Sequence, residues 1–280
     1  MQTARTATEL RRCIAAARRD GQRIAFVPTM GNLHAGHHSL LRIAREHADY
    51  VVASVFVNPT QFGPNEDYAR YPRTPEADAA GLQESGCNVL FLPAVEELYP
   101  YGAQQGVRIS VPVVTTTLEG ALRPGHFDGV ATVVGKLFHL VQPDVAVFGQ
   151  KDYQQLLVVR RLVRDLCFAI EIVAAPIVRE TNGLAMSSRN QYLDAATRAR
   201  AGVIHATLLA MAAAVQAGQA PAAITAAARA QLAAAGFEPD YVVLRQADDL
   251  AEPAPQQLSG LVALIAVRAG TTRLIDNLLI

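Results

Sequence analysis

The sequence is poor in cysteine and carries no excess of charge of either sign. Its three cysteines, Cys13, Cys87 and Cys167, are far apart and form no CxxC pair. This spacing argues against a disulfide framework and against a thiolate zinc site. Acidic and basic residues number 25 each among the 280, so the composition indicates no polybasic surface for nucleic acid or for an anionic membrane.

Long uninterrupted apolar segments are also missing from the sequence. The N-terminal stretch "MQTARTATELRRCIAAARRDG" lacks the apolar core of a signal peptide, and no segment reaches the length of an uncharged transmembrane span. With 51% hydrophobic residues the composition is that of a globular protein. We therefore expect a soluble, cytoplasmic protein with free thiols, and neither nucleic acid nor a membrane as a partner.

Short apolar runs alternate with segments of helical spacing over the first two thirds of the chain. The apolar runs cover residues 23–29, 50–57, 88–93, 144–149 and 170–176. The segments of helical spacing cover residues 8–19, 36–48, 75–86, 127–141 and 153–166. This alternation is typical of βαβ units, so it predicts an α/β fold with a Rossmann-like parallel sheet flanked by helices. In such sheets ligands bind beyond the carboxyl ends of the strands.

The composition changes after residue 195. Two Ala-rich helices are predicted over 197–218 and 221–236, followed by strands over 240–246, 261–270 and 272–280. Helices followed by adjacent strands indicate a smaller C-terminal α+β domain. We place the two domains at residues 1–176 and 177–280.

The stretch "VPTMGNLHAGHHSL" (27–40) carries three histidines directly after an apolar run. A metal site is one interpretation, but no Glu lies between His34 and His38 and no Cys or carboxylate cluster is near. An ordinary polar loop is a second interpretation. The third is a nucleotide site, because a flexible turn between a strand and a helix directs backbone N–H groups at an anion. Gly31 and Gly36 would permit the close approach of a phosphate.

Helical phase separates the last two histidines of this stretch. His37 shares a face with Leu40 and Leu41, whereas His38 shares a face with Arg42 and Arg45. We expect His37 to point inward and His38 to point outward. His38 is expected to be a solvated bystander.

Three further segments carry polar residues, two of them after predicted strands and the third after an apolar pair. In "FVNPTQF" (56–62), Asn58 and Gln61 offer donors and acceptors, although an Asn-Pro turn alone would explain the sequence. In "FGQKD" (148–152), Lys151 supplies a mobile cation for phosphates, and Asp152 is either a helix cap or the partner of a metal-bound water. In "LAMSSRNQYL" (184–193), the Ser-Ser-Arg turn is either a helix start or a phosphate clamp.

Here a resemblance becomes specific. "HAGH" (34–37) is similar to the HxGH signature of the nucleotidylyltransferase superfamily, the relatives of class I aminoacyl-tRNA synthetases, and "MSSRN" (186–190) resembles their KMSKS-type loop. Several motifs together resemble the pantothenate synthetase family of pantoate–β-alanine ligases, namely "PTMGNLHAGH", "NPTQF", "YPRT", "RPGHFDGVATVV", "FGQKDYQQ" and "MSSRNQYL". The resemblance runs from residue 23 to about residue 194. Gln150, where an acidic residue is common, and His38, where an apolar or long residue is common, depart from the family pattern.

The resemblance implies an ATP-dependent joining of pantoate to β-alanine through a pantoyl adenylate, with release of AMP and pyrophosphate. The pantoate carboxylate is already ionised at neutral pH, so adenylation needs positioning and charge neutralisation rather than a general base. The resemblance also implies that His37, His34 and Lys151 are catalytic. The residues that it implies for ATP are Met30, Gly31, Asn32, Leu33, His34, Ala35, Gly36, His37, Gly149, Gln150, Lys151, Asp152, Val178, Met186, Ser187, Ser188 and Arg189.

For pantoate the resemblance implies Gln61 and Gln155, and we add Asn58 to this substrate group. Mg²⁺ is expected as a companion of ATP that keeps several waters, so no protein metal ligand is assigned. A homodimer is the family expectation. The C-terminal domain is expected to act as a lid that keeps the reactive anhydride from water.

Three other functions stay open at this point. An adenylyltransferase that makes a dinucleotide would need a cationic substrate pocket, whereas Gln61 and Gln155 are neutral. A non-catalytic nucleotide-binding module would not need His37, Lys151 and Arg189 together. A zinc hydrolase would be recognised by metal analysis of the purified protein.

Overall fold

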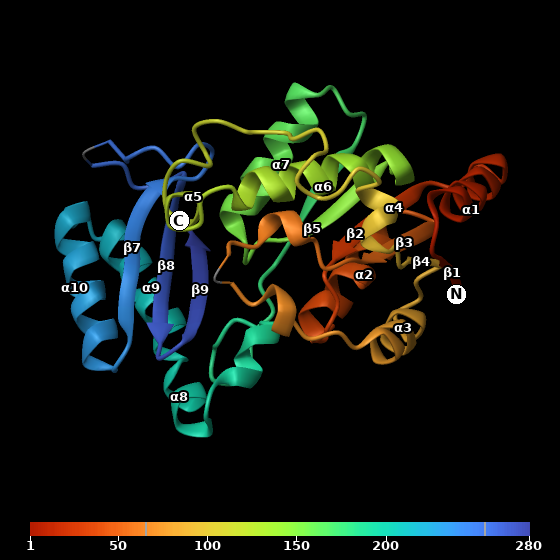
Figure 1. The fold of residues 1–280 in the computed structure, drawn as a ribbon. Coiled ribbons are helices and arrows are strands. Elements are labelled where there is room, and N and C mark those ends of the chain that lie inside the picture. The colour runs from red at the N-terminus through yellow and green to blue at the C-terminus, as the bar shows by residue number, and fades with distance from the viewer. Residues whose placement is uncertain (65, 255) are drawn as a thin grey trace. The chain divides into compact units, whose positions relative to one another are not determined.

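The computed structural model describes residues 1–64, 66–254 and 256–280, and the chain divides into two compact units (Figure 1). Unit 1 comprises Met1–Gly149 and Gln154–Ala175, and unit 2 comprises Gln150–Tyr153 and Pro176–Ile280. Each unit has a hydrophobic core of its own.

Unit 1 is built on a six-stranded parallel sheet with the order β1-β4-β3-β2-β5-β6. Its strands are β1 (Gln2–Ala4), β2 (Ile24–Thr29), β3 (Tyr50–Val55), β4 (Val89–Phe91), β5 (Val145–Gly149) and β6 (Glu171–Ala175). From β2 the order proceeds through β3 to β4 on one side, and from β5 to β6 on the other. The carboxyl ends of β2 and β5 are therefore neighbours at a topological switch point, where open α/β sheets bind ligands.

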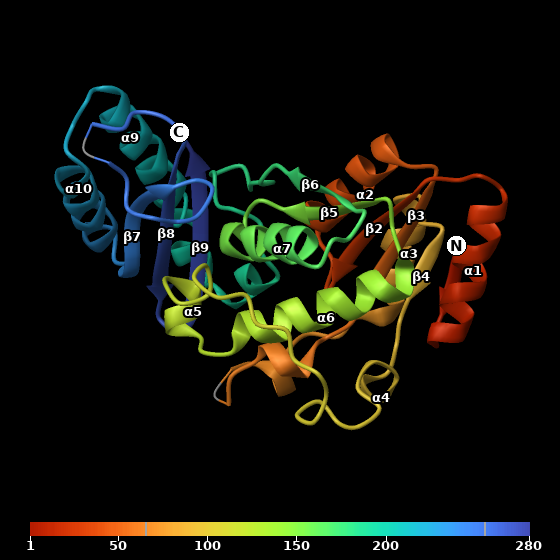
Figure 2. The same ribbon diagram turned by 90° about the horizontal axis from the view of Figure 1, so that it is seen from above.

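Helices cover both faces of this sheet because its buried strands are apolar on both sides (Figure 2). Along β2, Ile24 and Phe26 face one core and Ala25 and Val27 face the other. The first core is closed by α1 (Ala7–Arg19), α6 (His126–Val141) and α7 (Tyr153–Asp165). The second core is closed by α2 (Ala35–His47) and α3 (Pro75–Glu84). The predicted Rossmann-like fold is confirmed.

The remaining elements of unit 1 are short. They are α4 (Val95–Leu98), α5 (Glu119–Leu122) and the 3-10 turns η1 (Pro59–Gln61) and η2 (Tyr68–Arg70). The sequence did not predict these elements or β1, because three or four residues are too few to show a period. Helix α1 begins at Ala7, where Thr6 and Glu9 form a reciprocal capping box.

Unit 2 consists of a three-stranded antiparallel sheet packed against helices, which confirms the predicted α+β architecture (Figure 1). The strands are β7 (Glu238–Gln246), β8 (Leu261–Ala269) and β9 (Thr272–Leu279), in that order across the sheet. The main helices are α9 (Val203–Gln216) and α10 (Pro221–Ala234), which share one core with β7 and β8. Before them come η3 (Ser188–Tyr192) and α8 (Ala195–Arg200).

One correction concerns the first Ala-rich helix. The sequence predicted a single helix over 197–218, whereas the structure has α8 and α9 with a turn at 201–202 between them. The stretch Ala195–Gln216, which spans α8 and α9, has the length and apolar composition of a segment that could cross a membrane. This differs from the expectation that no segment of the sequence reaches that length. In the structure, however, Ile204, Leu208 and Met211 of α9 are buried in the core of unit 2. We therefore describe α9 as a core helix.

Candidate functional site

The turn after β2 has an unusual backbone. Gly31 and Asn32 both adopt the left-handed conformation, with φ of +84° and +51°. Thr29 begins the turn, where its hydroxyl donates to the Ser54 carbonyl and accepts from the Gly31 N–H. A Cβ atom at position 31 would lie 2.9 Å from Asp78 Oδ2, so the turn requires glycine there.

Asp78 of α3 holds this turn in place, and sequence reasoning missed it. Its carboxylate accepts the backbone N–H groups of Asn32 at 3.0 Å and Leu33 at 2.8 Å, and it is 3% exposed. The hydroxyl of Thr74 donates to the same carboxylate. A signal was available, because Asp78 lies one helical turn before the buried Leu82 and so belongs to the inner face of its helix.

His34 and His37 cap the N-terminus of α2. His34 Nδ1 accepts the Gly36 N–H at 3.1 Å, and His37 Nδ1 accepts the His34 N–H at 3.3 Å. Because both Nδ1 atoms accept hydrogen bonds, the proton of each neutral ring is on Nε2, which makes Nε2–H a donor. The first turn of α2 itself contains no acidic residue, and the carboxylate of Asp78 accepts from the N–H groups of Asn32 and Leu33, which precede the helix.

His38 differs from its prediction. Its ring is half-buried against α3, where Nδ1 forms a 2.8 Å hydrogen bond with the Ser85 hydroxyl. A Cβ atom at Gly81 would lie 2.6 Å from the His38 ring, which shows how closely the ring and the helix pack. The prediction of a solvated side chain was therefore wrong. Helical phase identified the outward face of α2, but not that α3 lies against it.

Asn58 organises the segment after β3. Its Nδ2 group donates to Gln61 Oε1 at 3.0 Å and to the Gly129 carbonyl at 3.1 Å. Its Oδ1 accepts from the hydroxyls of Thr60 and Tyr99, and the residue is 1% exposed. Burial raises the pKa of Tyr99, which keeps this phenol neutral as a donor. One amide N–H of Asn58 thus orients Gln61, and the other ties Asn58 to the backbone of α6.

The structure brings Gln61 to the turn after β2. Gln61 Nε2 donates to the Met30 sulfur at 3.0 Å, and Gln61 itself is buried. Gln155 is half-buried on α7, and in the part of the chain that the structure describes it makes no hydrogen bond with Gln61. Unit 1 therefore places Asn58, Gln61 and the Met30–His37 segment together, with Gly149 at the end of the neighbouring strand β5.

Arg123 and His126 contact the backbone carbonyl of Gln61, and Glu66 pairs with Arg123. His126 Nδ1 lies 2.7 Å from the Gln61 carbonyl, and His126 Nε2 lies 3.0 Å from Arg123 Nη1. Because the guanidinium can only donate, Nε2 is the acceptor and Nδ1–H donates to the carbonyl. Burial, together with the charge of Arg123, lowers the pKa of His126 to about 4, so the ring is neutral at physiological pH. Glu66 forms a two-pronged ion pair with Arg123, which lowers the pKa of Glu66 despite its partial burial.

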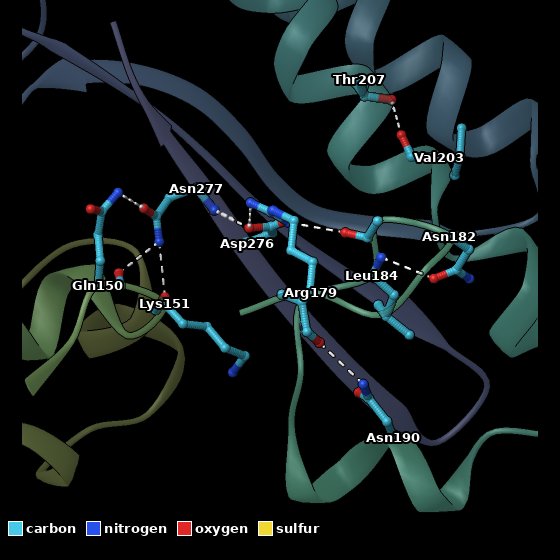
Figure 3. A network of polar contacts seen from close by, with 12 residues as sticks. Gln150, Lys151, Arg179, Asn182, Leu184, Asn190, Val203, Thr207, Asp276 and Asn277 are labelled. Atoms are coloured by element: carbon cyan, nitrogen blue, oxygen red, sulfur yellow. Dashed lines mark hydrogen bonds and ion pairs between the residues drawn. The ribbon is translucent and has the colours of Figure 1, made fainter. Parts of the chain in front are cut away.

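In unit 2, the predicted ATP-binding residues Gln150 and Lys151 lie against β9 (Figure 3). Asn277 Nδ2 donates to the carbonyls of Gln150 and Lys151, at 2.9 Å each, and Asn277 Oδ1 accepts from Gln150 Nε2. The Lys151 side chain extends away from this contact, and Asp152 is exposed. Sequence reasoning missed Asn277, because no local pattern links it to residues 126 and 127 positions away.

The other predicted ATP-binding residues of unit 2 lie on a folded-back segment. The Met186 N–H donates to the Val178 carbonyl at 2.9 Å, which brings these two residues together. Ser187 caps η3 through the Arg189 N–H, so Ser188 and Arg189 occupy its first two positions. Arg179 forms a two-pronged ion pair with the buried Asp276 of β9.

The described residues contain no group of three or more His, Cys, Asp or Glu side chains arranged to hold a metal ion. In the three-histidine stretch, the Nδ1 atoms of His34 and His37 accept backbone hydrogen bonds, and that of His38 pairs with Ser85. The rings of His34 and His37 therefore cap the start of α2, and the ring of His38 packs against α3.

The left-handed turn lies at the switch point of a parallel sheet and leads into a helix whose first turn contains no acidic residue. Together with the Nε2–H donors of the two histidines, this arrangement is typical of nucleotide-binding α/β proteins. The comparison with known proteins then specifies the family. The pattern of the pantoate-beta-alanine ligase family matches residues 2–279, and the chain belongs to this family.

Close relatives cover the whole chain. The pantothenate synthetase of Stenotrophomonas maltophilia (strain K279a) is 60% identical over 278 residues, 99% of either chain. That of Xylella fastidiosa (strain 9a5c) is 58% identical over 279 residues, again 99% of either chain. The resemblance inferred from the sequence motifs is confirmed.

Solved structures agree with this assignment. The crystal structure of pantothenate synthetase from Thermus thermophilus has a TM-score of 0.92 at 50% identity, with 99% of each chain covered. The pantoate-beta-alanine ligase from Francisella tularensis, solved in complex with beta-gamma ATP and beta-alanine, has a TM-score of 0.81 at 33% identity. That match covers 100% of this chain and 97% of the other.

Proposed function

We propose that this chain condenses pantoate with β-alanine through a pantoyl adenylate, with ATP as co-substrate and AMP and pyrophosphate as products. The observation that carries the proposal is the paired His34 and His37 cap, which offers two Nε2–H donors at the positive end of α2. Donors held by the backbone need no reorganisation when charge develops on a phosphate, which is what adenylation demands.

In the first step, a pantoate carboxylate oxygen attacks the α-phosphorus, and the bond from that phosphorus to the bridging oxygen of pyrophosphate breaks. We assign His37 as donor to the phosphate oxygens, with His34 assisting it and Lys151 neutralising the leaving pyrophosphate. The remaining ATP contacts are assigned to Met30–Gly36, Gly149, Gln150, Asp152, Val178 and Met186–Arg189. The segment over 186–189 supplies hydroxyl and guanidinium donors for the phosphates.

In the second step, the uncharged amine of β-alanine attacks the pantoyl carbonyl carbon. A C–N bond forms, the C–O bond to AMP breaks, and the nitrogen loses a proton to solvent or to a phosphate oxygen. Gln61 is assigned to the hydroxyl and carboxylate groups of pantoate, together with Gln155. Asn58 belongs to this group through its hydrogen bond to Gln61 rather than through a free donor.

The family also suggests Mg²⁺, which would neutralise the phosphates of bound ATP. Such an ion would be held mainly by phosphates and water, and exposed Asp152 is the residue that we assign to one of its waters. We further propose a cytoplasmic homodimer in which residues 1–176 bind ATP and pantoate. Residues 177–280 would close as a lid that protects the mixed anhydride.

The adenylate route is tested with pantoate that carries ¹⁸O in its carboxylate. Transfer of one ¹⁸O into AMP is expected, because the attacked phosphorus keeps the carboxylate oxygen when the amine cleaves the C–O bond. Each of ATP, Mg²⁺, pantoate and β-alanine is omitted in turn as a control. Label-free AMP, or ADP as the product, would refute the adenylate.

A further inference from the structure

The short segment Gln150–Tyr153 belongs to unit 2, although Gly149 and Gln154 on either side of it belong to unit 1. Asn277 of β9 is the residue that binds its backbone. The side chain of Asn277 is 1% exposed and makes three hydrogen bonds with Gln150 and Lys151 (Figure 3). Within unit 2, this contact fixes the backbone from which the Lys151 side chain extends.

Asparagine suits this position for a chemical reason. Two carbonyl oxygens converge on the side chain, and they require two N–H donors from one atom. The amide Nδ2 provides both, whereas its Oδ1 accepts from Gln150 Nε2. An aspartate would direct an oxygen at the two carbonyls, and a serine could donate to one of them at most.

The neighbouring residue of β9 holds the second candidate phosphate-binding segment. Asp276 pairs with Arg179, whose Nη1 also donates to the Gly183 carbonyl, and Arg179 forms a β-bridge with Ala185. Met186 follows directly in the chain. Two consecutive residues of β9 thus hold these segments: Asn277 binds the backbone of Gln150 and Lys151, and Asp276 binds Arg179 (Figure 3). Through the bridge to Ala185, Arg179 lies at the base of the Met186–Arg189 segment.

We propose that Asn277 is a positioning residue for adenylate formation, which acts by holding the backbone of Gln150 and Lys151 so that the Lys151 ammonium reaches the phosphates of ATP. The inference rests on the proposed role of Lys151. A lysine side chain has four rotatable bonds, so the position of its backbone decides which region its ammonium samples. Loss of that position is costly, because small displacements of catalytic groups lower rates strongly.

The test is a double-mutant cycle between Asn277→Ala and Lys151→Ala, measured by pantoate-dependent exchange of labelled pyrophosphate into ATP. In the native chain, Asn277→Ala is expected to lower the exchange rate by roughly 10- to 100-fold. In the Lys151→Ala background, the same substitution should change the rate by less than about twofold, because the two residues act as a unit. The KM for ATP should rise, while the KM for pantoate stays near its native value.

Two further variants separate positioning from folding. Asn277→Ser retains one donor and should recover part of the exchange rate, whereas Asn277→Asp should not recover at neutral pH. Thr207→Ala is the control, since the Thr207 hydroxyl is also buried and donates to a backbone carbonyl, that of Val203, within unit 2. It should leave the exchange rate close to that of the native chain.

The outcomes distinguish the two proposals. If the native chain itself shows no pantoate-dependent exchange, the proposed function fails. If the native chain exchanges but the Asn277→Ala and Lys151→Ala effects multiply independently, Asn277 supports the fold only and the inference is overturned. If Asn277→Ala does not fold, the cycle is run with Asn277→Ser, for which the same non-additivity is expected.

Discussion

The imidazole rings of His34 and His37 lie 4.1 Å apart between centroids, tilted by 46°, and the His34 N–H donates to Nδ1 of His37. This pairing gives His37 two separable roles. Its Nδ1 atom completes the capping box of α2, whereas its Nε2–H is the donor that we assign to phosphate.

Substitutions at His37 should separate these roles. His37→Asn can keep a cap acceptor near the Nδ1 position but loses the donor at Nε2, so it should fold normally and lower pantoate-dependent pyrophosphate exchange by roughly 100-fold or more. His37→Ala loses the cap as well, and should also lower the free energy of unfolding by about 1 kcal/mol. His38→Ala serves as the neighbouring control, because the His38 ring pairs with Ser85, the residue that follows α3, and this variant should retain exchange. Full exchange activity in His37→Asn would rule out its role as phosphate donor.

Asp78 should control ATP binding through the turn that it holds. Asp78→Asn replaces one acceptor oxygen by an NH₂ group that faces a backbone N–H, either that of Asn32 or that of Leu33. The unsatisfied donors should lower the free energy of unfolding by about 1–3 kcal/mol. The KM for ATP should rise more than the KM for pantoate. Glu76→Gln, an exposed change in the same helix, is the control for loss of an acidic charge, and an unchanged KM for ATP in Asp78→Asn would contradict the prediction.

The sequence predicted this site unevenly, for physical reasons. Apolar periodicity was sufficient to place β2 and α2, and with them the strand-turn-helix that carries His34 and His37. The residues that hold the turns were not predictable in the same way. Asp78 lies 45 and 46 positions from the N–H groups that it accepts, and Asn277 lies 126 and 127 positions from its carbonyls.

His38 shows a related limit. Its phase on α2 was read correctly, but phase alone does not reveal that a second helix covers the outer face. The break between α8 and α9 at 201–202 contains Gly202, which disfavours a helix interior, but a single glycine among Ala-rich neighbours was too weak a signal to divide the predicted helix. Local patterns therefore located the elements, and contacts between distant segments determined which side chains support the site.

Gly129 should be essential for the position of Gln61. A Cβ atom there would clash with the Thr60 carbonyl group and lie 2.7 Å from Gln61 Cα, so Gly129→Ala must displace η1. The overpacking should cost about 1–3 kcal/mol of unfolding free energy and raise the KM for pantoate. Gly135→Ala in the same helix is the control, because its Cβ atom would meet only the flexible end of the Ile109 side chain. Both substitutions replace glycine by alanine in a helix, so both gain roughly 0.5–1 kcal/mol of helix propensity. Steady-state kinetics and denaturant unfolding of both variants compare the two positions, and equal KM values for pantoate would contradict the predicted displacement.

The neutral His126 should make the stability of the fold depend on pH. Its pKa is lowered from 6.5 to about 4, so between these values the unfolded chain binds a proton that the folded chain does not. Stability must therefore fall as the pH decreases through this window, and His126 should contribute a loss of about 2 kcal/mol between pH 7 and pH 5. His126→Asn keeps a donor for the Gln61 carbonyl but cannot titrate, so its unfolding free energy should change less over the same range. The difference is measured by urea unfolding of the native chain and of His126→Asn. His139→Asn is the control, because His139 is an exposed histidine in the same helix. A pH dependence in His126→Asn as steep as in the native chain would show that protonation of another group destabilises the fold.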